Sequence, residues 1–327
     1  MKSANMFGLT FLSATSKTTT HRVVPFRIGK AFFASVAGYV AGGSGGGNIS
    51  GIDKVSFPAD TKTTLSATLT TARNSAAGFA NSGVAGYVAG GAGGGNQSGI
   101  DKVSFPADTK TTLSATLTTA RYAGAGFANS GVAGYVAGGS DSGGFISGID
   151  KVSFAADTRT TLSATLTSAR EYSAGFANSG VAGYVAGGDT GGFTSGIDKV
   201  SFPADTLTTL SATLTTARAQ SAGFANSGVA GYVAGGFDTA FISGIDKVSF
   251  PADTRTTLSA TLTNGRNYVG GFANSGVAGY VAGGSNGGGN ISGIDKVSFP
   301  ADTKTTLSAT LTTARQLVAG FADSGSL

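Results

Sequence analysis

Carboxylates are the only side chains in this sequence whose spacing suggests catalysis. Asp141, Asp189 and Asp238 occupy corresponding places in three consecutive copies of a repeated sequence, where a pair could perform general acid–base hydrolysis. No asymmetric set of supporting residues accompanies them, and such a site needs that support. His21 is the single histidine, Glu171 is the single glutamate and cysteine is absent, so the sequence offers no Ser-His-Asp set, Cys-His pair or His-rich metal site. We therefore expect a protein that is not an enzyme and uses no cofactor or metal.

These carboxylates belong to a repeat that must position them. The sequence Tyr-Val-Ala-Gly-Gly occurs six times at a spacing of 48 residues, with one step of 49, beginning at Tyr39, Tyr87, Tyr135, Tyr184, Tyr232 and Tyr280. A fixed period in this range indicates a repeat architecture, in which neighbouring copies bury one continuous core.

Each copy has the pattern of four short strands joined by tight turns. In the second copy the predicted strands are residues 77–81, 84–91, 100–105 and 112–118. The last alternates leucine or alanine with threonine or serine, which is the period-two pattern of a strand. Pro106 and Asp108 supply turn chemistry between the third and fourth strands. Helices are disfavoured because glycine and threonine are dense and no apolar stripe recurs at a spacing of 3.6.

The order of these elements resembles the kelch repeat across residues 38–327. The matching segments are Gly-Tyr-Val-Ala-Gly-Gly (86–91), Ile-Asp-Lys-Val-Ser-Phe-Pro (100–106), Asp-Thr-Lys-Thr (108–111) and Thr-Ala-Arg (119–121). The usual tryptophan of the fourth strand is missing, and about its place stand Lys62, Lys110, Arg159 and Leu207. The resemblance implies a β-propeller with four-stranded blades, of a divergent, glycine-rich type similar to repeats of phage and environmental bacterial proteins.

The two ends of the repeat region predict a closed ring. Residues 319–325 are a lone copy of the first-strand segment, whereas the regular part begins with a second-strand segment at 36–43. A C-terminal strand that completes the N-terminal blade removes the exposed sheet edge. We therefore predict an all-β, six-bladed propeller of four-stranded antiparallel blades, with repeats starting near residues 38, 86, 134, 183, 231 and 279. A β-solenoid of long rungs would share the period, but the turns and the complementary ends favour the ring.

The charge distribution separates the first 37 residues from the rest. The net charge of +5 is carried there, by Lys2, Lys17, Arg22, Arg27 and Lys30, and the remainder is neutral. Residues 1–37 are interpreted as an irregular basic leader or a degenerate partial repeat, with part of a seventh blade as the alternative. A neutral repeat region argues against nucleic acid as a partner. No apolar run approaches the ~20 residues of a membrane span, and no clear signal peptide is evident.

Two charged positions are the same in all six copies, and both are predicted to be structural. The aspartate of Ile-Asp-Lys is expected to form a cross-strand or inter-blade ion pair. The arginine after the fourth strand is expected to bond to neighbouring backbone carbonyls. These positions are Asp53, Asp101, Asp150, Asp198, Asp246 and Asp295, and Arg73, Arg121, Arg170, Arg218, Arg266 and Arg315.

Differences between the copies gather in two windows. One follows the Gly-Gly doublet (44–48, 92–97, 140–145, 189–194, 237–241, 285–290), and the other follows the arginine (74–76, 122–124, 171–173, 219–221, 267–269, 316–318). In an antiparallel four-stranded blade, the connections after the second and fourth strands emerge at the same edge, so both windows should lie on one face. The candidate binding residues are Asn48, Asn74, Asn96, Gln97, Tyr122, Asp141, Phe145, Glu171, Tyr172, Asp189, Phe193, Gln220, Phe237, Asp238, Phe241, Asn267, Tyr268, Asn286, Asn290 and Gln316.

Aromatic platforms with amide and carboxylate neighbours suit a carbohydrate or a protein epitope. We therefore expect a non-catalytic binding module that recognises a glycan or protein on a cell surface, as an extracellular or virion-surface protein of the phage-tail or bacterial-surface type. One alternative is a structural or assembly disc with no specific ligand. Loop differences that arose by drift are the corresponding explanation for the windows.

Overall fold

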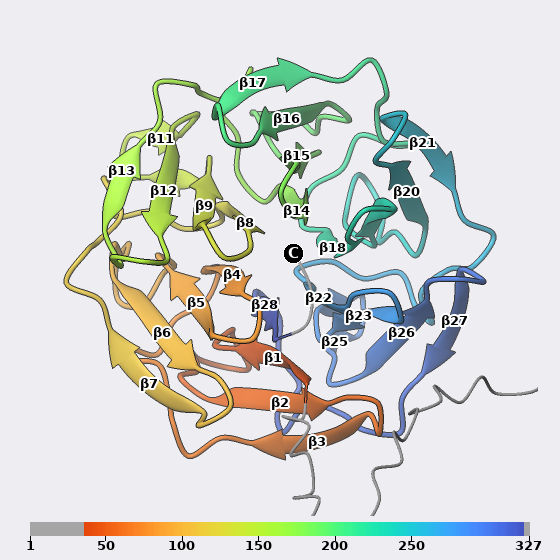
Figure 1. The fold of residues 1–327 in the computed structure, drawn as a ribbon. Helices are drawn as coiled ribbons and strands as arrows, with labels where there is room; N and C mark the ends of the chain where they lie inside the picture. Colours follow the sequence, from red (N-terminus) through yellow and green to blue (C-terminus); the bar gives the residue numbers. More distant parts are fainter. Residues whose placement is uncertain (1–35, 324–327) are drawn as a thin grey trace, which may run out of the picture. The chain divides into compact units, whose positions relative to one another are not determined.

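The computed structural model describes residues 36–323, which form a ring of six four-stranded antiparallel sheets (Figure 1). In blade 2, β4 (Ala77–Asn81) lies at the axis, followed outward by β5 (Ala85–Ala89), β6 (Ile100–Ser104) and β7 (Thr109–Thr112). The innermost strands of neighbouring blades contact one another around the axis. The predicted six-bladed propeller is confirmed.

The other complete blades repeat this order. Blade 3 contains β8 (Ala125–Asn129), β9 (Ala133–Ala137), β12 (Ile149–Ser153) and β13 (Arg159–Thr161). Blade 4 contains β14 (Ala174–Asn178), β15 (Ala182–Ala186), β16 (Ile197–Ser201) and β17 (Thr206–Thr209). Blade 5 contains β18 (Ala222–Asn226), β19 (Ala230–Ala234), β20 (Ile245–Ser249) and β21 (Thr254–Thr257). Blade 6 contains β22 (Gly270–Asn274), β23 (Ala278–Ala282), β26 (Ile294–Ser298) and β27 (Thr303–Thr306).

Blade 1 is built from both ends of the described chain. Its order is β28 (Ala319–Ala322), β1 (Ala37–Ala41), β2 (Ile52–Ser56) and β3 (Thr61–Thr64), and Figure 1 shows the blue β28 beside the red β1. Tyr39 of β1 is paired with Phe321 of β28. The predicted closure by the C-terminal strand is therefore confirmed. The interpretation of residues 1–37 falls almost entirely outside the described residues.

Two strand predictions were wrong in their limits. Val84 was assigned to the second strand but lies in the preceding turn and is 51% exposed. Residues 112–118 were assigned to the fourth strand, which instead ends at Thr112. The alternation beyond Thr112 reflects burial without strand pairing. The chain crosses there toward the next blade, burying Leu117 while its N–H donates to the carbonyl of Ser98 in the loop before β6.

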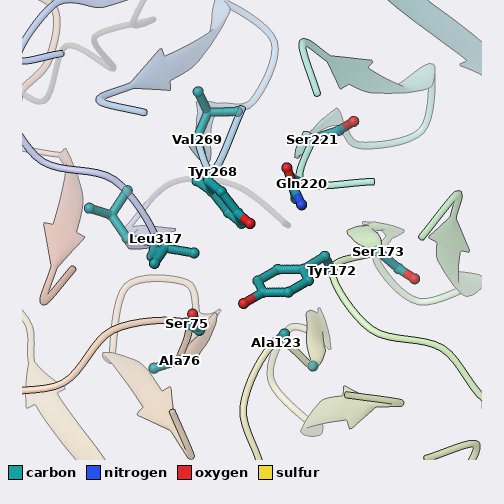
Figure 2. Close-up of a pocket in the computed structure, with 12 residues that line it drawn as sticks. Ser75, Ala76, Ala123, Tyr172, Ser173, Gln220, Ser221, Tyr268, Val269 and Leu317 are labelled. Atoms are coloured by element: carbon teal, nitrogen blue, oxygen red, sulfur yellow. The ribbon is translucent and has the colours of Figure 1, made fainter. Parts of the chain in front are cut away.

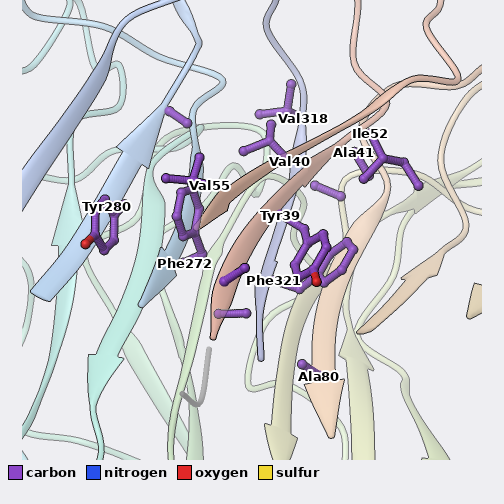
Figure 3. Close-up of a cluster of buried hydrophobic side chains, with 14 of the residues drawn as sticks. Tyr39, Val40, Ala41, Ile52, Val55, Ala80, Phe272, Tyr280, Val318 and Phe321 are labelled. Carbon is purple, nitrogen blue, oxygen red and sulfur yellow. The ribbon is translucent and has the colours of Figure 1, made fainter. Parts of the chain in front are cut away.

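Stacked aromatic rings fill the space between blades. Tyr87 and Phe79 of blade 2 are fully buried, with ring centroids 5.2 Å apart, and Tyr87 also stacks on Phe154 of blade 3 at 5.1 Å. Figure 3 shows the equivalent rings of Tyr39 and Phe321 side by side in blade 1. Because each stack includes rings from two blades, it fixes their packing as well as burying apolar area.

The predicted structural roles of the constant aspartate and arginine are confirmed. In blade 2, the Arg73 Nη2 donates to the Asp101 carboxylate at 3.0 Å and to the Val88 carbonyl at 3.0 Å. Thr70, which precedes this arginine, donates to Asp101 through both its N–H and its hydroxyl. The carboxylate therefore ties the end of one blade to the third strand of the next. The pair is almost fully buried, at 3% and 1% exposure.

Glycine allows the innermost strands to approach closely at the axis. A methyl group built on Gly126 of β8 would overlap the carbonyl oxygen of Gly78 in β4. The same overlap recurs between each pair of neighbouring blades around the ring. These glycines let the inner strands pack closely, and they line a cavity of about 70 Å³ at the axis.

Candidate functional site

The two variable windows of each blade lie side by side. An isolated β-bridge joins them in every blade, extending the ladder between the first two strands beyond its end. The bridges are Ser44 with Gln316, Asn74 with Ala92, Tyr122 with Ser140, Glu171 with Asp189, Ala219 with Phe237, and Asn267 with Ser285. Beyond these bridges, β10 (Ser140–Asp141) pairs with β11 (Gly144–Phe145), and β24 (Ser285–Asn286) with β25 (Gly289–Asn290). The expectation that both windows occupy the same end of the blades agrees with this geometry.

The middle residues of the shorter windows form a closed backbone ring around the axis, which we call the rim. Each N–H donates to the carbonyl of the rim residue in the preceding blade, at distances between 2.7 and 2.9 Å. All six residues have a left-handed backbone, with φ between +52° and +64°. The rim residues are Ser75, Ala123, Tyr172, Gln220, Tyr268 and Leu317. Their backbone is therefore fixed, while their side chains differ.

A cavity of about 90 Å³ lies at the rim and adjoins the cavity lined by the axial glycines. Figure 2 shows the hydroxyl ends of Tyr172 and Tyr268 and the amide of Gln220 converging over it. The two tyrosine rings lie edge to face, with centroids 5.3 Å apart. Tyr172 shares a hydrogen bond with the Ser75 side chain, and Tyr268 with Gln220. We call this cavity the axial pocket.

The residues one step below the rim differ between the blades. Blades 4 and 5 contribute Ser173 and Ser221, whereas blades 6 and 1 contribute Val269 and Val318. The two serine hydroxyls donate to the carbonyls of Gly187 and Gly235, so their oxygens are held in place. The serine hydroxyls thus turn toward the second strands, and Val269 and Val318 are only 7% and 8% exposed, so the groups that face the pocket come from the rim side chains.

Negative charge gathers beside the pocket. Burial raises the pKa of the Glu171 carboxyl, the charge of Asp189 raises it further, and a hydrogen bond with Tyr122 lowers it only in part. The acidic residues of the windows all belong to blades 3, 4 and 5, and no window contains lysine or arginine. The face therefore disfavours anionic ligands.

The longer windows of blades 3 to 5 carry an arc of phenylalanine rings. Phe193 and Phe237 lie edge to face at 6.0 Å, and Phe237 and Phe241 at 5.4 Å. Phe241 is 38% exposed and Phe145 39%. We call these four rings the aromatic arc, and they supply flat apolar area beside the axial pocket.

Amide side chains predominate on the other blades, and many of them fasten the loops. Asn74 donates to Asn48 at 2.6 Å, and Asn290 donates to the carbonyl of Ser44 at 3.2 Å. Asn267 donates to Gln220 at 2.8 Å, while Gln97 bonds to carbonyls of its own loop. Asn96 forms a bridge with Ala92 inside its own window, and Gln316 belongs to the bridge that joins the windows of blade 1.

The three aspartates considered for catalysis each hold their own loop. Asp141 accepts from the Gly143 N–H at 2.7 Å and Asp189 from the Gly191 N–H at 2.9 Å. Asp238 accepts from the backbone of Ala240 at 2.8 Å, and Asn286 plays the same part toward Gly288. These contacts give each carboxylate a structural task within its loop.

Sequence analysis missed several residues of the axial pocket. Ser75, Ala123 and Leu317 of the rim were not among the candidate residues, nor were the serines and valines below it. Their only signal was the middle position of the shorter window, because a left-handed backbone at serine, alanine or leucine has no signature in the sequence.

No family model matches this chain, and no curated protein is significantly similar to it. Within residues 36–323, the structure contains no helix long and apolar enough to cross a membrane. The chain is a six-bladed β-propeller, a fold commonly used as a binding or scaffold module.

Proposed function

We propose that this propeller is a non-catalytic binding module whose varied face recognises a glycan or protein on a cell surface. In this proposal the protein acts outside the cell or on a virion, as phage-tail and bacterial-surface proteins do. Nucleic acid is not its partner, and it uses neither metal nor cofactor. We also assign its repeats to a divergent kelch-like type, on the Gly-Gly doublet that follows each second strand and the arginine that follows each fourth.

The residue types at the rim support a binding function. A left-handed backbone costs a residue with a side chain on the order of 1 kcal/mol relative to glycine. If stability alone governed these positions, glycine, asparagine or aspartate would be expected there. None of the six rim residues is of these types, and they comprise five different amino acids. Side chains at the rim are therefore retained against a stability cost, which favours selection for binding over drift.

A second left-handed position in the same repeat provides an internal comparison. Asp60, Asp108, Asp157, Asp205, Asp253 and Asp302 also have φ near +50°. There the residue is aspartate in all six copies, and in each case it accepts hydrogen bonds from a tyrosine and a lysine of a neighbouring blade, as Asp108 does from Tyr39 and Lys54. This aspartate position is therefore identical in all six copies, although its backbone is left-handed like that of the rim. The rim varied, although its backbone bonds are equally regular.

The test compares the natural protein with a uniform variant. All twelve windows of the variant carry the sequence of blade 2, which lacks aromatic and acidic residues, and its fold is checked by circular dichroism and thermal unfolding. Both proteins are screened against glycans and against whole cells. Binding by the natural protein that the uniform variant loses supports the proposal. Equal binding, or no binding by either, would mean that the propeller is a structural disc.

A further inference from the structure

We propose that the axial pocket binds the acetamido group of a neutral N-acetylated sugar. The inference rests on the proposed function and deepens it, because it names the ligand class and the place on the varied face where that ligand is read. It depends on the size, polarity and charge of the pocket.

The size of the pocket fits a small substituent. The axial pocket has a volume of about 90 Å³, where roughly 10–15 Å³ suffices for one water molecule, so it can hold several non-hydrogen atoms. An acetamido group has four and fits within it. A whole sugar ring is larger, so it must remain above the rim. A second cavity of about 70 Å³, lined by glycines of the innermost strands, adjoins the axial pocket.

The polar part of the rim matches the amide of such a group. The Tyr172 and Tyr268 hydroxyls converge over the pocket, and a hydroxyl provides one donor and two acceptor positions, so each keeps capacity beyond its one bond in the protein. The Tyr268 hydroxyl, which lies beside the Gln220 amide, can donate to an acetamido carbonyl. Ser75 gives its proton to Asn74, so Tyr172 donates to Ser75 and its oxygen is left to accept from the acetamido N–H.

The apolar part of the rim matches the methyl group. Leu317 lines the pocket from blade 1 and is not a buried core residue. A hydroxymethyl group would place a polar atom against this side chain without a partner, which is unfavourable. The wall therefore distinguishes an acetamido group from the hydroxyl groups that every sugar carries.

The polar groups are held in place before a ligand arrives. Asn267 donates to the Gln220 Oε1 at 2.8 Å, which fixes the orientation of that amide beside Tyr268. Ser75 donates to Asn74 at 2.8 Å, and Asn74 donates to Asn48, so the partner of Tyr172 is also anchored. Side chains already ordered in this way lose little entropy on binding.

The surroundings favour a neutral sugar. No charged side chain lines the pocket, and Glu171 and Asp189 beside it repel a carboxylate. The aromatic arc offers ring faces against which the apolar face of a neighbouring sugar can pack. An N-acetylated oligosaccharide can thus place one substituent in the axial pocket and extend over the arc.

The test uses three oligosaccharides that share one skeleton. The probes are β-1,4-linked trimers of N-acetylglucosamine, glucosamine and glucose, titrated into the full chain by calorimetry. We expect the N-acetylated trimer to bind at least about tenfold more tightly than the glucose trimer, since hydrogen bonds and methyl contacts are both lost with the acetamido group. The cationic glucosamine trimer separates acetamido recognition from simple attraction to carboxylates.

Two variants test the polar and the apolar residues of the rim. Tyr172→Phe removes one hydroxyl and keeps the ring, and Leu317→Ser installs the residue that the rim already carries at Ser75. Each should weaken binding of the N-acetylated trimer about three- to tenfold. Val132→Ala, in an exposed turn at the other end of blade 3, serves as the control and should bind like the natural protein.

The outcomes separate this inference from the proposed function. Equal affinity for the three trimers, preference for glucosamine, or unchanged binding by both pocket variants would overturn the acetamido assignment. If the natural protein still bound cells or other glycans while the uniform variant did not, the proposed function would stand without it. Absence of binding to every glycan and cell would overturn both.

Discussion

Replacing Asp101 by asparagine tests how the blades are held together. Asp101 accepts from Thr70 N–H at 2.9 Å, from the Thr70 and Thr112 hydroxyls at 2.7 Å each, and from Arg73 at 3.0 Å. Asparagine has one acceptor oxygen, so its NH₂ group would face hydrogen-bond donors. Because asparagine is neutral, Arg73 would also be buried without a counter-charge. Removal of one partner from a buried pair lowers the free energy of unfolding by about 3–5 kcal/mol.

The assay is thermal unfolding followed by calorimetry. At roughly 2–4 °C per kcal/mol for a domain of this size, the melting temperature should fall on the order of 10 °C. The matched control is Lys102→Met, which breaks an ion pair with Asp157 whose side chains are 20% and 32% exposed. That change should cost less than about 1 kcal/mol. A loss below 1 kcal/mol for Asp101→Asn would refute the assignment of inter-blade cohesion to this carboxylate.

The same carboxylate predicts a pH dependence. Burial alone would raise the pKa of Asp101, but hydrogen bonds from Thr70 and Thr112 and the charge of Arg73 outweigh it, and the pKa lies below its ordinary value of 3.8. A depressed pKa means that the carboxylate stabilises the fold above the unfolded value, and that this contribution disappears as the pH falls through the folded value. The difference between the natural protein and Asp101→Asn should therefore shrink below pH 3.8, as seen in melts taken from pH 7 downward. A difference that stays constant to pH 2 would contradict this account.

Two further changes address the axis and the closure. Gly126→Ala should destabilise the protein by about 3 kcal/mol or more in a urea titration, because the added methyl group meets the backbone of Gly78. The control Gly192→Ala adds its methyl group in open space and should leave the stability nearly unchanged. Deletion of residues 319–327 removes β28 with the buried Phe321 and exposes the edge of β1, so size-exclusion chromatography should show oligomers in place of the natural species. An unchanged elution profile and melting temperature would show that blade 1 does not need its inner strand.

Much of the architecture could be predicted from the sequence because the same pattern of strands and turns occurs in six copies. The Tyr-Val-Ala-Gly-Gly period determined the number of blades, and the lone first-strand copy at the C-terminus indicated how the ring closes. The strand limits at Val84 and Thr112 were wrong for a physical reason. An alternating apolar pattern indicates which side chains are buried. A segment that runs from one blade to the next can show this pattern without pairing with another strand.

The site was harder to predict because backbone geometry creates it. The windows around Tyr172 and Tyr268 were visible as differences between copies. The rim that presents them depends on left-handed residues bonded from blade to blade, and leucine or alanine at such a position gives no local signal. The convergence of Tyr172, Gln220 and Tyr268 on one cavity likewise required the ring, since these residues belong to separate repeats.

Closure by β28 also has a consequence for how this strand pairs with β1 during folding. The strand Ala-Gly-Phe-Ala has nearly the same sequence as the inner strand of every other blade, so residue chemistry does not direct it to β1. The correct partner is selected by topology, because β1 is the second strand that has no inner strand from its own repeat. At high concentration the β28 of one molecule would meet the β1 of another with the same complementarity. Domain-swapped chains of propellers are therefore the expected misassembly, and fast intramolecular closure is the safeguard against them.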